Sequence, residues 1–359
     1  MIPLYKPYMP KQLPELENIL HSGALAYGKW GREFEQSISD FTGAPNVATV
    51  NSYNAAVQLI FLTLGVGYGD EVITSPQSCL ASNMPILSSG ATVVWADIDP
   101  KTGTLDPESV KSKITPNTKV IFHNHHCGYP GYIDEINAIG RERGIIVVDD
   151  CIEAFGSEYK GKMMGASNTD VTVFSFQTVR LPNTIDGGAV CFRDRELHNK
   201  ACKLRDFGID RPTFRDSLGE ISPLSDITEV GMGVTMSELN SYIGLQQMQE
   251  ISSLLAQQRM NGNTWKLKLE QSLDYQGISD DRKINPNYWV MGMLYKKGRV
   301  AGIEHFRKLG FYASTVHLPN NRYSVFGKAN MDKSLKGVEE FYNHFVAVPS
   351  GWWVKEYEI

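Results

Sequence analysis

Short apolar runs alternate with longer stretches of helical periodicity through the first two thirds of the chain. The apolar runs predict strands, at residues 46–50, 71–75, 91–99, 118–126 and 144–151. The stretches between several of these runs predict helices, at residues 55–65, 83–90 and 133–144. Strands that alternate with helices of about ten residues are typical of parallel βαβ units with helices on both sheet faces. The pattern therefore predicts an α/β fold.

Two later apolar runs, at residues 171–176 and 186–192, predict a hairpin-like pair of strands. The pattern changes after about residue 236, because residues 236–273 form either one long helix or two in succession. The rest of the chain predicts a smaller α+β unit. We therefore predict two domains, a large α/β domain of residues 1–245 and a small α+β domain of residues 246–359.

Polar residues follow four of the predicted strands directly. These candidate site segments are Asn51–Asn54, Pro76–Cys79, His123–Tyr129 and Asp149–Glu153. In open parallel sheets, ligands bind at the carboxyl ends of the strands. The sequence therefore predicts that a ligand site is built from these segments. No Walker loop and no G-x-G-x-x-G follows any strand, so a nicotinamide site has no support.

Composition narrows the class of protein. The 359 residues carry a net charge of −5 and no run of Lys or Arg, which argues against a nucleic-acid surface. The apolar stretch 41–69 is broken by Pro45 and several polar residues, so it predicts a strand–loop–helix unit and not a membrane span. The five cysteines form no C-x-x-C pair, which indicates reduced thiols and a cytoplasmic protein.

Seven segments, taken together and in order, resemble the DegT/DnrJ/EryC1/StrS aminotransferases, which act on nucleotide-linked keto-sugars. They are residues 23–44, 65–76, 126–139, 147–165, 173–188, 204–211 and 236–247. The resemblance implies a fold type I enzyme: a mainly parallel seven-stranded sheet flanked by helices, with a small C-terminal α+β domain. It also implies that the large domain binds pyridoxal phosphate through a lysine imine, at the interface of a dimer. Such a protein transfers an amino group from glutamate to a sugar, for polysaccharide or O-antigen assembly.

The resemblance assigns roles to several strand-end residues. Asp150 matches the aspartate that pairs with the pyridine nitrogen, where a carboxylate keeps the ring protonated as an electron sink. Ser175, with Gln177 beside it, matches the serine that binds the cofactor phosphate. Ser52 and Tyr53 fall on the other phosphate loop, where the family usually has Gly-Thr at the start of a helix. Without the resemblance, Asp150 would be interpreted as a helix N-cap and the serines as turn residues.

Four positions depart from the family pattern. Arg180 stands five residues after the phosphate serine, where the lysine belongs, and a guanidinium cannot form the aldimine. Its planar fork could hold a carboxylate or a phosphate instead. Glu153 replaces a glutamine that donates to the phenolic oxygen, so either Glu153 is protonated through burial or the phenolate is absent. Cys79 replaces an aromatic residue that stacks on the ring, and Gly233 replaces an asparagine or lysine contributed by the partner subunit. Four changes together favour natural divergence over an engineered Lys→Arg substitution.

The histidines complete the predicted site. His125 matches a family histidine, and His317 matches a region that touches the sugar or closes the small domain. The triplet of His123, His125 and His126 invites a metal interpretation, but we expect alternating histidines on a strand to point to opposite faces. We therefore predict no metal site.

Two hypotheses remain open. The first is an enzyme of nucleotide-sugar metabolism, with pyridoxal phosphate or pyridoxamine phosphate bound non-covalently; a dehydratase-like variant would use Glu153 or His125 as its base. The second is a catalytically inactive homologue that binds no cofactor. Such a homologue would bind a sugar nucleotide or pair with an active paralogue in a heterodimer, where the first hypothesis expects a homodimer. Neither hypothesis involves nucleic acid or a membrane.

Overall fold

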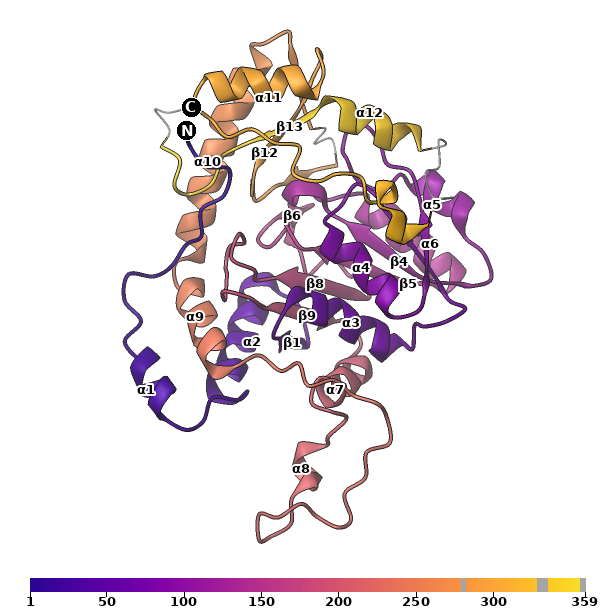
Figure 1. Ribbon diagram of the computed structural model, residues 1–359, viewed down its shortest axis with the longest axis vertical. Helices are drawn as coiled ribbons and strands as arrows, with labels where there is room; N and C mark the ends of the chain where they lie inside the picture. Colours follow the sequence, from indigo (N-terminus) through magenta and orange to yellow (C-terminus); the bar gives the residue numbers. More distant parts are fainter. Residues whose placement is uncertain (279–281, 328–334, 356–359) are drawn as a thin grey trace.

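We analysed a computed structural model, which describes residues 1–278, 282–327 and 335–355 (Figure 1). Its centre is a seven-stranded sheet. The strand order is β1 (Val47–Val50), β9 (Gly188–Phe192), β8 (Val171–Ser175), β5 (Ile146–Cys151), β4 (Thr118–Asn124), β2 (Glu71–Thr74) and β3 (Thr92–Trp95). Strand β9 is antiparallel to both of its neighbours, and the remaining pairs are parallel. The mainly parallel seven-stranded sheet and the hairpin-like pair β8–β9 are therefore confirmed.

Side chains alternate between two helical layers along the central strands. On β4 and β5, Val120, Phe122 and Val148 pack in the hydrophobic cluster that contains α3. Their odd-numbered neighbours Ile121 and Val147 pack in a second cluster with α5 and α6. This period of two is that of a strand buried on both faces. It also sends the adjacent residues Asp149 and Asp150 to opposite faces of the sheet.

The helices of the large domain are short to medium in length. They are α1 (Leu16–His21), α2 (Lys29–Thr42), α3 (Tyr53–Leu64), α4 (Leu80–Ser88), α5 (Pro107–Lys113), α6 (Ile133–Arg143), α7 (Arg195–Leu204) and α8 (Arg211–Phe214). A 3-10 turn, η1 (His126–Gly128), follows β4. A helix begins soon after β1, after β2 and after η1, so the polar segments at these strand ends converge on one edge of the sheet.

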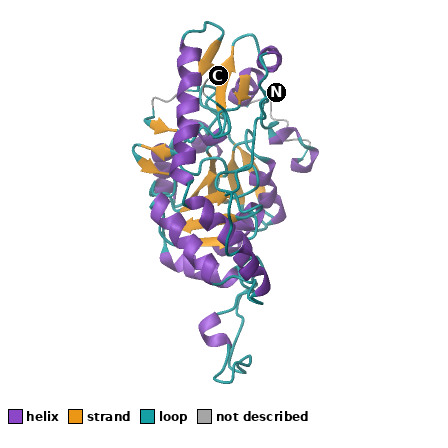
Figure 2. Ribbon diagram, turned by 90° about the vertical axis from the view of Figure 1, so that its left-hand side faces the viewer, coloured by secondary structure: helices purple, strands orange, loops and turns teal. Residues whose placement is uncertain are grey.

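The long helical stretch is two helices, α9 (Glu238–Met248) and α10 (Ile251–Glu270). Beyond α10, a three-stranded sheet of β10 (Tyr275–Gly277), β12 (Met291–Tyr295) and β13 (Phe345–Val348) is flanked by α11 (Arg299–Lys308) and α12 (Lys336–His344) (Figures 1 and 2). Two 3-10 turns, η2 (Asn320–Arg322) and η3 (Ser324–Phe326), precede α12. These elements form the expected C-terminal α+β part, and the boundary at residue 245 stays a prediction.

Contacts across the chain join the two parts. A second small sheet pairs β11 (Ile284–Asn285) with β6 (Glu158–Tyr159), which in turn pairs with β7 (Lys162–Met163). The N-terminal residues pack on the C-terminal part, where Ile2 bridges to Phe311 and Trp353 donates to the Pro3 carbonyl. Figure 1 accordingly shows the N-terminus at the same end of the molecule as α11 and β13.

A long arm leaves the opposite end. Residues 207–230, with α8, extend away from the body in both views (Figures 1 and 2). No helix in the described part of the chain is long and apolar enough to cross a membrane.

Candidate cofactor site

The carboxylate of Asp150 is buried at the end of β5, and this chain supplies donors to both of its oxygens. The Tyr53 hydroxyl donates to Oδ1 at 2.5 Å, and the Ile152 amide donates to the same oxygen at 3.1 Å. The Asn124 side-chain amide donates to Oδ2 at 2.8 Å. Burial raises the pKa of Asp150, and these hydrogen bonds oppose that rise. The carboxylate is therefore already satisfied without a pyridine nitrogen.

Tyr53 is the first residue of α3, and its side chain is fully buried. Ser52 caps the helix, because its hydroxyl accepts a hydrogen bond from the Ala55 amide at 3.1 Å. The Tyr53 hydroxyl also lies 3.3 Å from the Ser82 hydroxyl of α4. Burial, followed by the charge of Asp150, raises the pKa of Tyr53 well above its ordinary value. The phenol therefore stays protonated and donates to Asp150.

Arg180 occupies a buried position beside Glu153, with 6% of its surface exposed. Its Nη2 atom lies 3.6 Å from Glu153 Oε1, and its guanidinium carbon lies 4.1 Å from the centroid of the Trp289 ring. Among the described residues, the Nε and Nη1 atoms meet no hydrogen-bond partner. Arg180 is thus an ion-paired, ring-stacked cation with two unused donors.

Glu153 links Arg180 to His317. Its Oε1 lies 2.7 Å from His317 Nε2, and its Oε2 accepts the Cys127 amide at 2.6 Å. Burial alone would raise the pKa of Glu153, but the His317 and Arg180 neighbours lower it to about 2. Of the two alternatives from the sequence, the protonated glutamate is therefore wrong. The carboxylate is ionised and accepts hydrogen bonds only.

The space beside these charges is small. Ser175, at the end of β8, is buried, and its hydroxyl accepts the Gln177 amide at 3.4 Å. Ser175, Glu153, Arg180 and Trp289 border a cavity of about 10 Å³. That volume is close to the minimum for one water molecule. Cys79, which precedes α4, is half-buried, and burial raises the pKa of its thiol.

The structure brings most of the predicted residues together, but not Gly233. Gly233 forms a backbone bridge with Asp206 at the base of the arm, and a Cβ there would lie 2.2 Å from the Phe207 ring. The glycine therefore gives Phe207 room within this chain. Its expected place beside a partner's cofactor stays a prediction.

Two residues near the site, Trp289 and Tyr5, have no motif that could identify them from the sequence. Trp289 lies between β11 and β12; it stacks on Arg180 and donates to the Val179 carbonyl. Tyr5 stacks on Trp289, with ring centroids 4.7 Å apart and an interplanar angle of 14°. Asn124, which ends β4 beside Asp150 of β5, lies within the predicted site segment His123–Tyr129, although no role was predicted for it.

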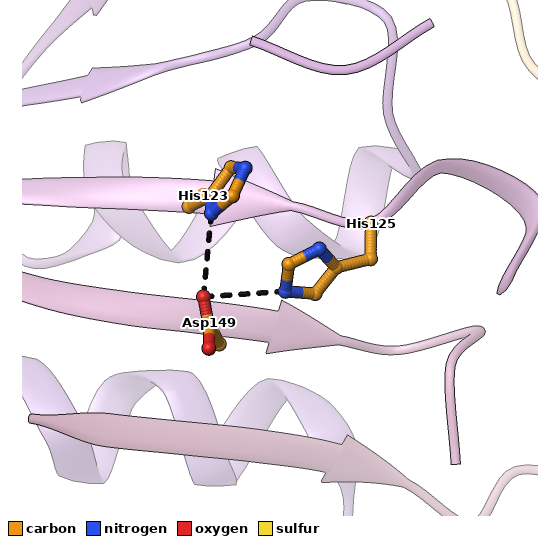
Figure 3. A group of neighbouring side chains, drawn as sticks. All are labelled: His123, His125 and Asp149. Carbon is orange, nitrogen blue, oxygen red and sulfur yellow. Dashed lines mark ion pairs between the residues drawn. The ribbon is translucent and has the colours of Figure 1, made fainter. Parts of the chain in front are cut away.

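His125 lies on the other face of the sheet, in a cluster with His123 and Asp149 (Figure 3). His123 Nδ1 and His125 Nε2 lie 3.3 Å and 3.2 Å from the same oxygen of Asp149. The expectation that the histidines point to opposite faces is therefore wrong for this pair. Residues two apart share a face of a strand, and the chain keeps that side as it leaves β4.

One hydrogen bond indicates which nitrogen of the His125 ring carries the proton. The Gly131 amide donates to His125 Nδ1 at 3.0 Å, so in the neutral ring Nε2 carries the proton that faces Asp149. The other oxygen of Asp149 accepts from Thr169 at 2.6 Å and from Ser167 at 3.0 Å. Burial raises the pKa of Asp149, but the two histidines lower it well below its ordinary value. The two histidines therefore lie beside a buried carboxylate whose Oδ1 meets no partner with hydrogen-bond geometry among the described residues. In its neutral form, His125 has no free lone pair.

The cluster of His123, His125 and Asp149 is one group of side chains that could offer ligands to a metal ion. His126, Cys127 and Glu153 form a second such group. Burial lowers the pKa of His126 to about 4 and raises the pKa of the Cys127 thiol well above its ordinary value. A protonated thiol is a poor ligand, because metals bind the thiolate. Glu153 is already paired with His317 and the Cys127 amide.

The sheet order, the strand-end aspartate and the helix that starts beside it define the class as a fold type I aminotransferase-like protein. The DegT/DnrJ/EryC1/StrS aminotransferase family model matches residues 9–358. The chain belongs to this family.

Solved structures of sugar aminotransferases have the same fold. The chain is 28% identical to the sugar aminotransferase CalS13 of Micromonospora echinospora and 29% identical to AtS13 of Actinomadura melliaura, each with a TM-score of 0.91. Both comparisons cover 100% of this chain, with 97% of CalS13 and 96% of AtS13. The putative sugar aminotransferase Spr1654 of Streptococcus pneumoniae, 23% identical, has been solved in PMP and PLP forms. Its PMP form has a TM-score of 0.89 and covers 100% of this chain and 96% of its own.

The residues of this chain do not fit pyridoxal phosphate in the arrangement that the structure describes. The Asp150 carboxylate, which was expected to hold the pyridine nitrogen, accepts a hydrogen bond from Tyr53. The position expected to hold the imine lysine is Arg180, which pairs with Glu153. An ionised Glu153 cannot donate to a phenolate. The adjoining cavity accepts about one water molecule.

Proposed function

We propose that this chain is a sugar-nucleotide-binding member of the family that carries out no transamination by itself. The observation that supports this proposal most directly is the pair of contacts that hold the Arg180 side chain. Its guanidinium pairs with Glu153 and stacks on Trp289, and a guanidinium is not a nucleophile. A group held in this way supplies neither an imine nitrogen nor a proton shuttle.

The proposed ligand is a nucleotide-linked keto-sugar in the cytoplasmic metabolism of amino sugars. Family membership and the sugar aminotransferases among the solved structures support the sugar. The Nε and Nη1 atoms of Arg180, which meet no hydrogen-bond partner among the described residues, suit an anionic oxygen of such a ligand. All five cysteines are free, which supports a reducing compartment.

A dehydratase that uses pyridoxamine phosphate is the weaker proposal, because a base is lacking. Glu153, with a pKa of about 2, is a poor proton acceptor near neutral pH. His125 receives the Gly131 amide on one nitrogen and faces Asp149 with the other. The two bases predicted for this route are therefore both engaged.

Binding of a nucleotide-linked sugar tests the proposal. We expect the native protein to bind such a sugar in calorimetry and to transfer no amino group from glutamate. Arg180→Met removes charge-assisted hydrogen bonds of about 1.5–3 kcal/mol, so affinity is expected to fall by roughly 10- to 150-fold. Arg143→Met, at an exposed position of α6, is the matched control. Transamination by the native protein, or unchanged affinity in Arg180→Met, would contradict the proposal.

We also propose a dimer, with the arm of residues 207–230 as part of its interface. The arm exposes apolar side chains; Leu218 and Leu224 are 84% and 92% exposed. Exposed apolar residues gathered on one protruding segment are typical of a binding surface. The partner is a second copy of this chain, with a paralogue as the alternative.

Charge placed on the arm is expected to separate the subunits. The double variant Leu218→Asp/Leu224→Asp should elute as a monomer in size-exclusion chromatography with light scattering, and the native protein as a dimer. Leu273→Asp, at an 87% exposed position outside the arm, should remain dimeric. A native monomer, or an arm variant that stays dimeric, would rule out this interface between identical chains.

A further inference from the structure

We propose that Tyr53 is a built-in substitute for the cofactor ring, which keeps the cofactor site closed in the native protein. The inference concerns the ring site, and so it stands whether or not Arg180 has the role proposed above. It adds that the chain takes up neither pyridoxal phosphate nor pyridoxamine phosphate, even without a covalent link.

The first support for this proposal is the position of the Tyr53 side chain relative to the central strands. The start of α3 lies over β9, because a Cβ on Gly188 would be 3.1 Å from the Tyr53 Cα. The Tyr53 hydroxyl reaches Asp150 on β5. Strand β8 lies between β9 and β5 in the sheet and ends at Ser175. The phenol therefore passes over the end of β8, between the helix start and Asp150. Family resemblance expects the cofactor phosphate at the helix start and Ser175, and its nitrogen at Asp150.

The Tyr53 hydroxyl donates to Asp150 the same kind of hydrogen bond that a protonated pyridine nitrogen would donate. A pyridinium N–H donates to the aspartate carboxylate. The Tyr53 O–H donates to the same carboxylate at 2.5 Å, and burial keeps this phenol protonated. The donor–acceptor pattern around Asp150 is thus complete. A buried carboxylate without such a donor would cost free energy, so the hydroxyl also stabilises the closed state.

The sizes of the side chains at positions 53 and 79 support the same conclusion. The family usually has a small threonine at position 53 and an aromatic ring at position 79. This chain has the reverse, a buried tyrosine at 53 and a half-buried cysteine at 79. Cys79 lies close enough to contribute to the raised pKa of Tyr53. Since interiors are close-packed, a gain of one ring and a loss of another at neighbouring positions conserves the packed volume.

The test is a titration with pyridoxamine phosphate and pyridoxal phosphate, followed by absorbance and by the thermal unfolding midpoint. Three forms are compared: the native protein, Tyr53→Phe, which keeps the ring, and Tyr53→Thr, which removes it. We expect no saturable binding and no shift of the midpoint for the first two. Tyr53→Thr should bind pyridoxamine phosphate saturably, and its midpoint should rise with ligand concentration.

Several outcomes would overturn the inference. Saturable binding by the native protein or by Tyr53→Phe would show that the aromatic ring at position 53 does not close the site. The same conclusion would follow from a folded Tyr53→Thr that binds neither cofactor. If Tyr53→Thr fails to fold, binding by the native protein or by Tyr53→Phe still overturns the inference. Binding without an imine would overturn this inference alone, whereas amino transfer from glutamate would overturn the proposed function.

Discussion

Replacing Glu153 with alanine is expected to lower the free energy of unfolding by about 3–5 kcal/mol, the usual cost of breaking a buried ion pair. Glu153 is the buried acceptor for His317 and the Cys127 amide, and it pairs with Arg180. Its removal leaves the guanidinium of Arg180 in a buried position without a counter-charge. Urea denaturation of the two proteins at neutral pH measures the loss.

A second variant separates the ion pair from simple loss of volume. Glu153→Ala/Arg180→Met removes both charges, so it should recover part of the stability lost in Glu153→Ala. Glu153→Gln keeps an acceptor for the Cys127 amide and should lose less than Glu153→Ala. Equal losses in Glu153→Ala and in the double variant would show that Arg180 does not depend on this carboxylate.

The second large effect is a loss of stability between about pH 6.5 and pH 4. His123 and His126 are fully buried, and burial lowers the pKa of each to about 4, whereas the unfolded value is about 6.5. Between these values the unfolded chain binds a proton at each ring and the folded chain does not. Acidification through this window therefore favours unfolding, by about 3 kcal/mol for each ring. Above pH 6.5 this effect is absent, and below pH 4 it is complete.

His126→Phe is the control for this pH dependence. His126 packs against the rings of Phe341 and Phe345, so phenylalanine keeps an aromatic side chain there and removes the titrating group. The loss of stability between pH 6.5 and pH 4 should fall by about half. Glu153 acts in a lower window, because its depressed pKa stabilises the fold above about pH 4 and this contribution fades towards pH 2. An unchanged acid dependence in His126→Phe would assign the effect to other groups.

The sequence was sufficient for the architecture because its signals are periodic or local. Alternating apolar runs predicted the parallel strands, and the motifs predicted the family. The long helical stretch could not be divided in advance. Its two helices meet at Gln249 and Glu250, where neither Gly nor Pro marks a break.

The site was predicted at the level of positions and not of contacts. Arg180 and Glu153 lie in the loops that follow β8 and β5, His317 lies in the C-terminal part, and the structure joins the three in one network. Tyr53 was predicted to lie on a phosphate loop, but its side chain turns to Asp150. Its hydroxyl contacts Asp150 and Ser82 on two other elements, and no local pattern encodes these contacts. Trp289 and Tyr5 were missed for the same reason, because tertiary packing alone places them beside Arg180.

A crystal structure of the native protein, grown with saturating pyridoxamine phosphate, tests most directly whether the chain's own residues close the cofactor site. We expect the Tyr53 hydroxyl to lie on Asp150 and Arg180 to lie beside Glu153, with no electron density for a cofactor between them. A pyridine nitrogen bonded to Asp150, with the Tyr53 side chain displaced, would contradict it and restore the non-covalent enzyme as the better account.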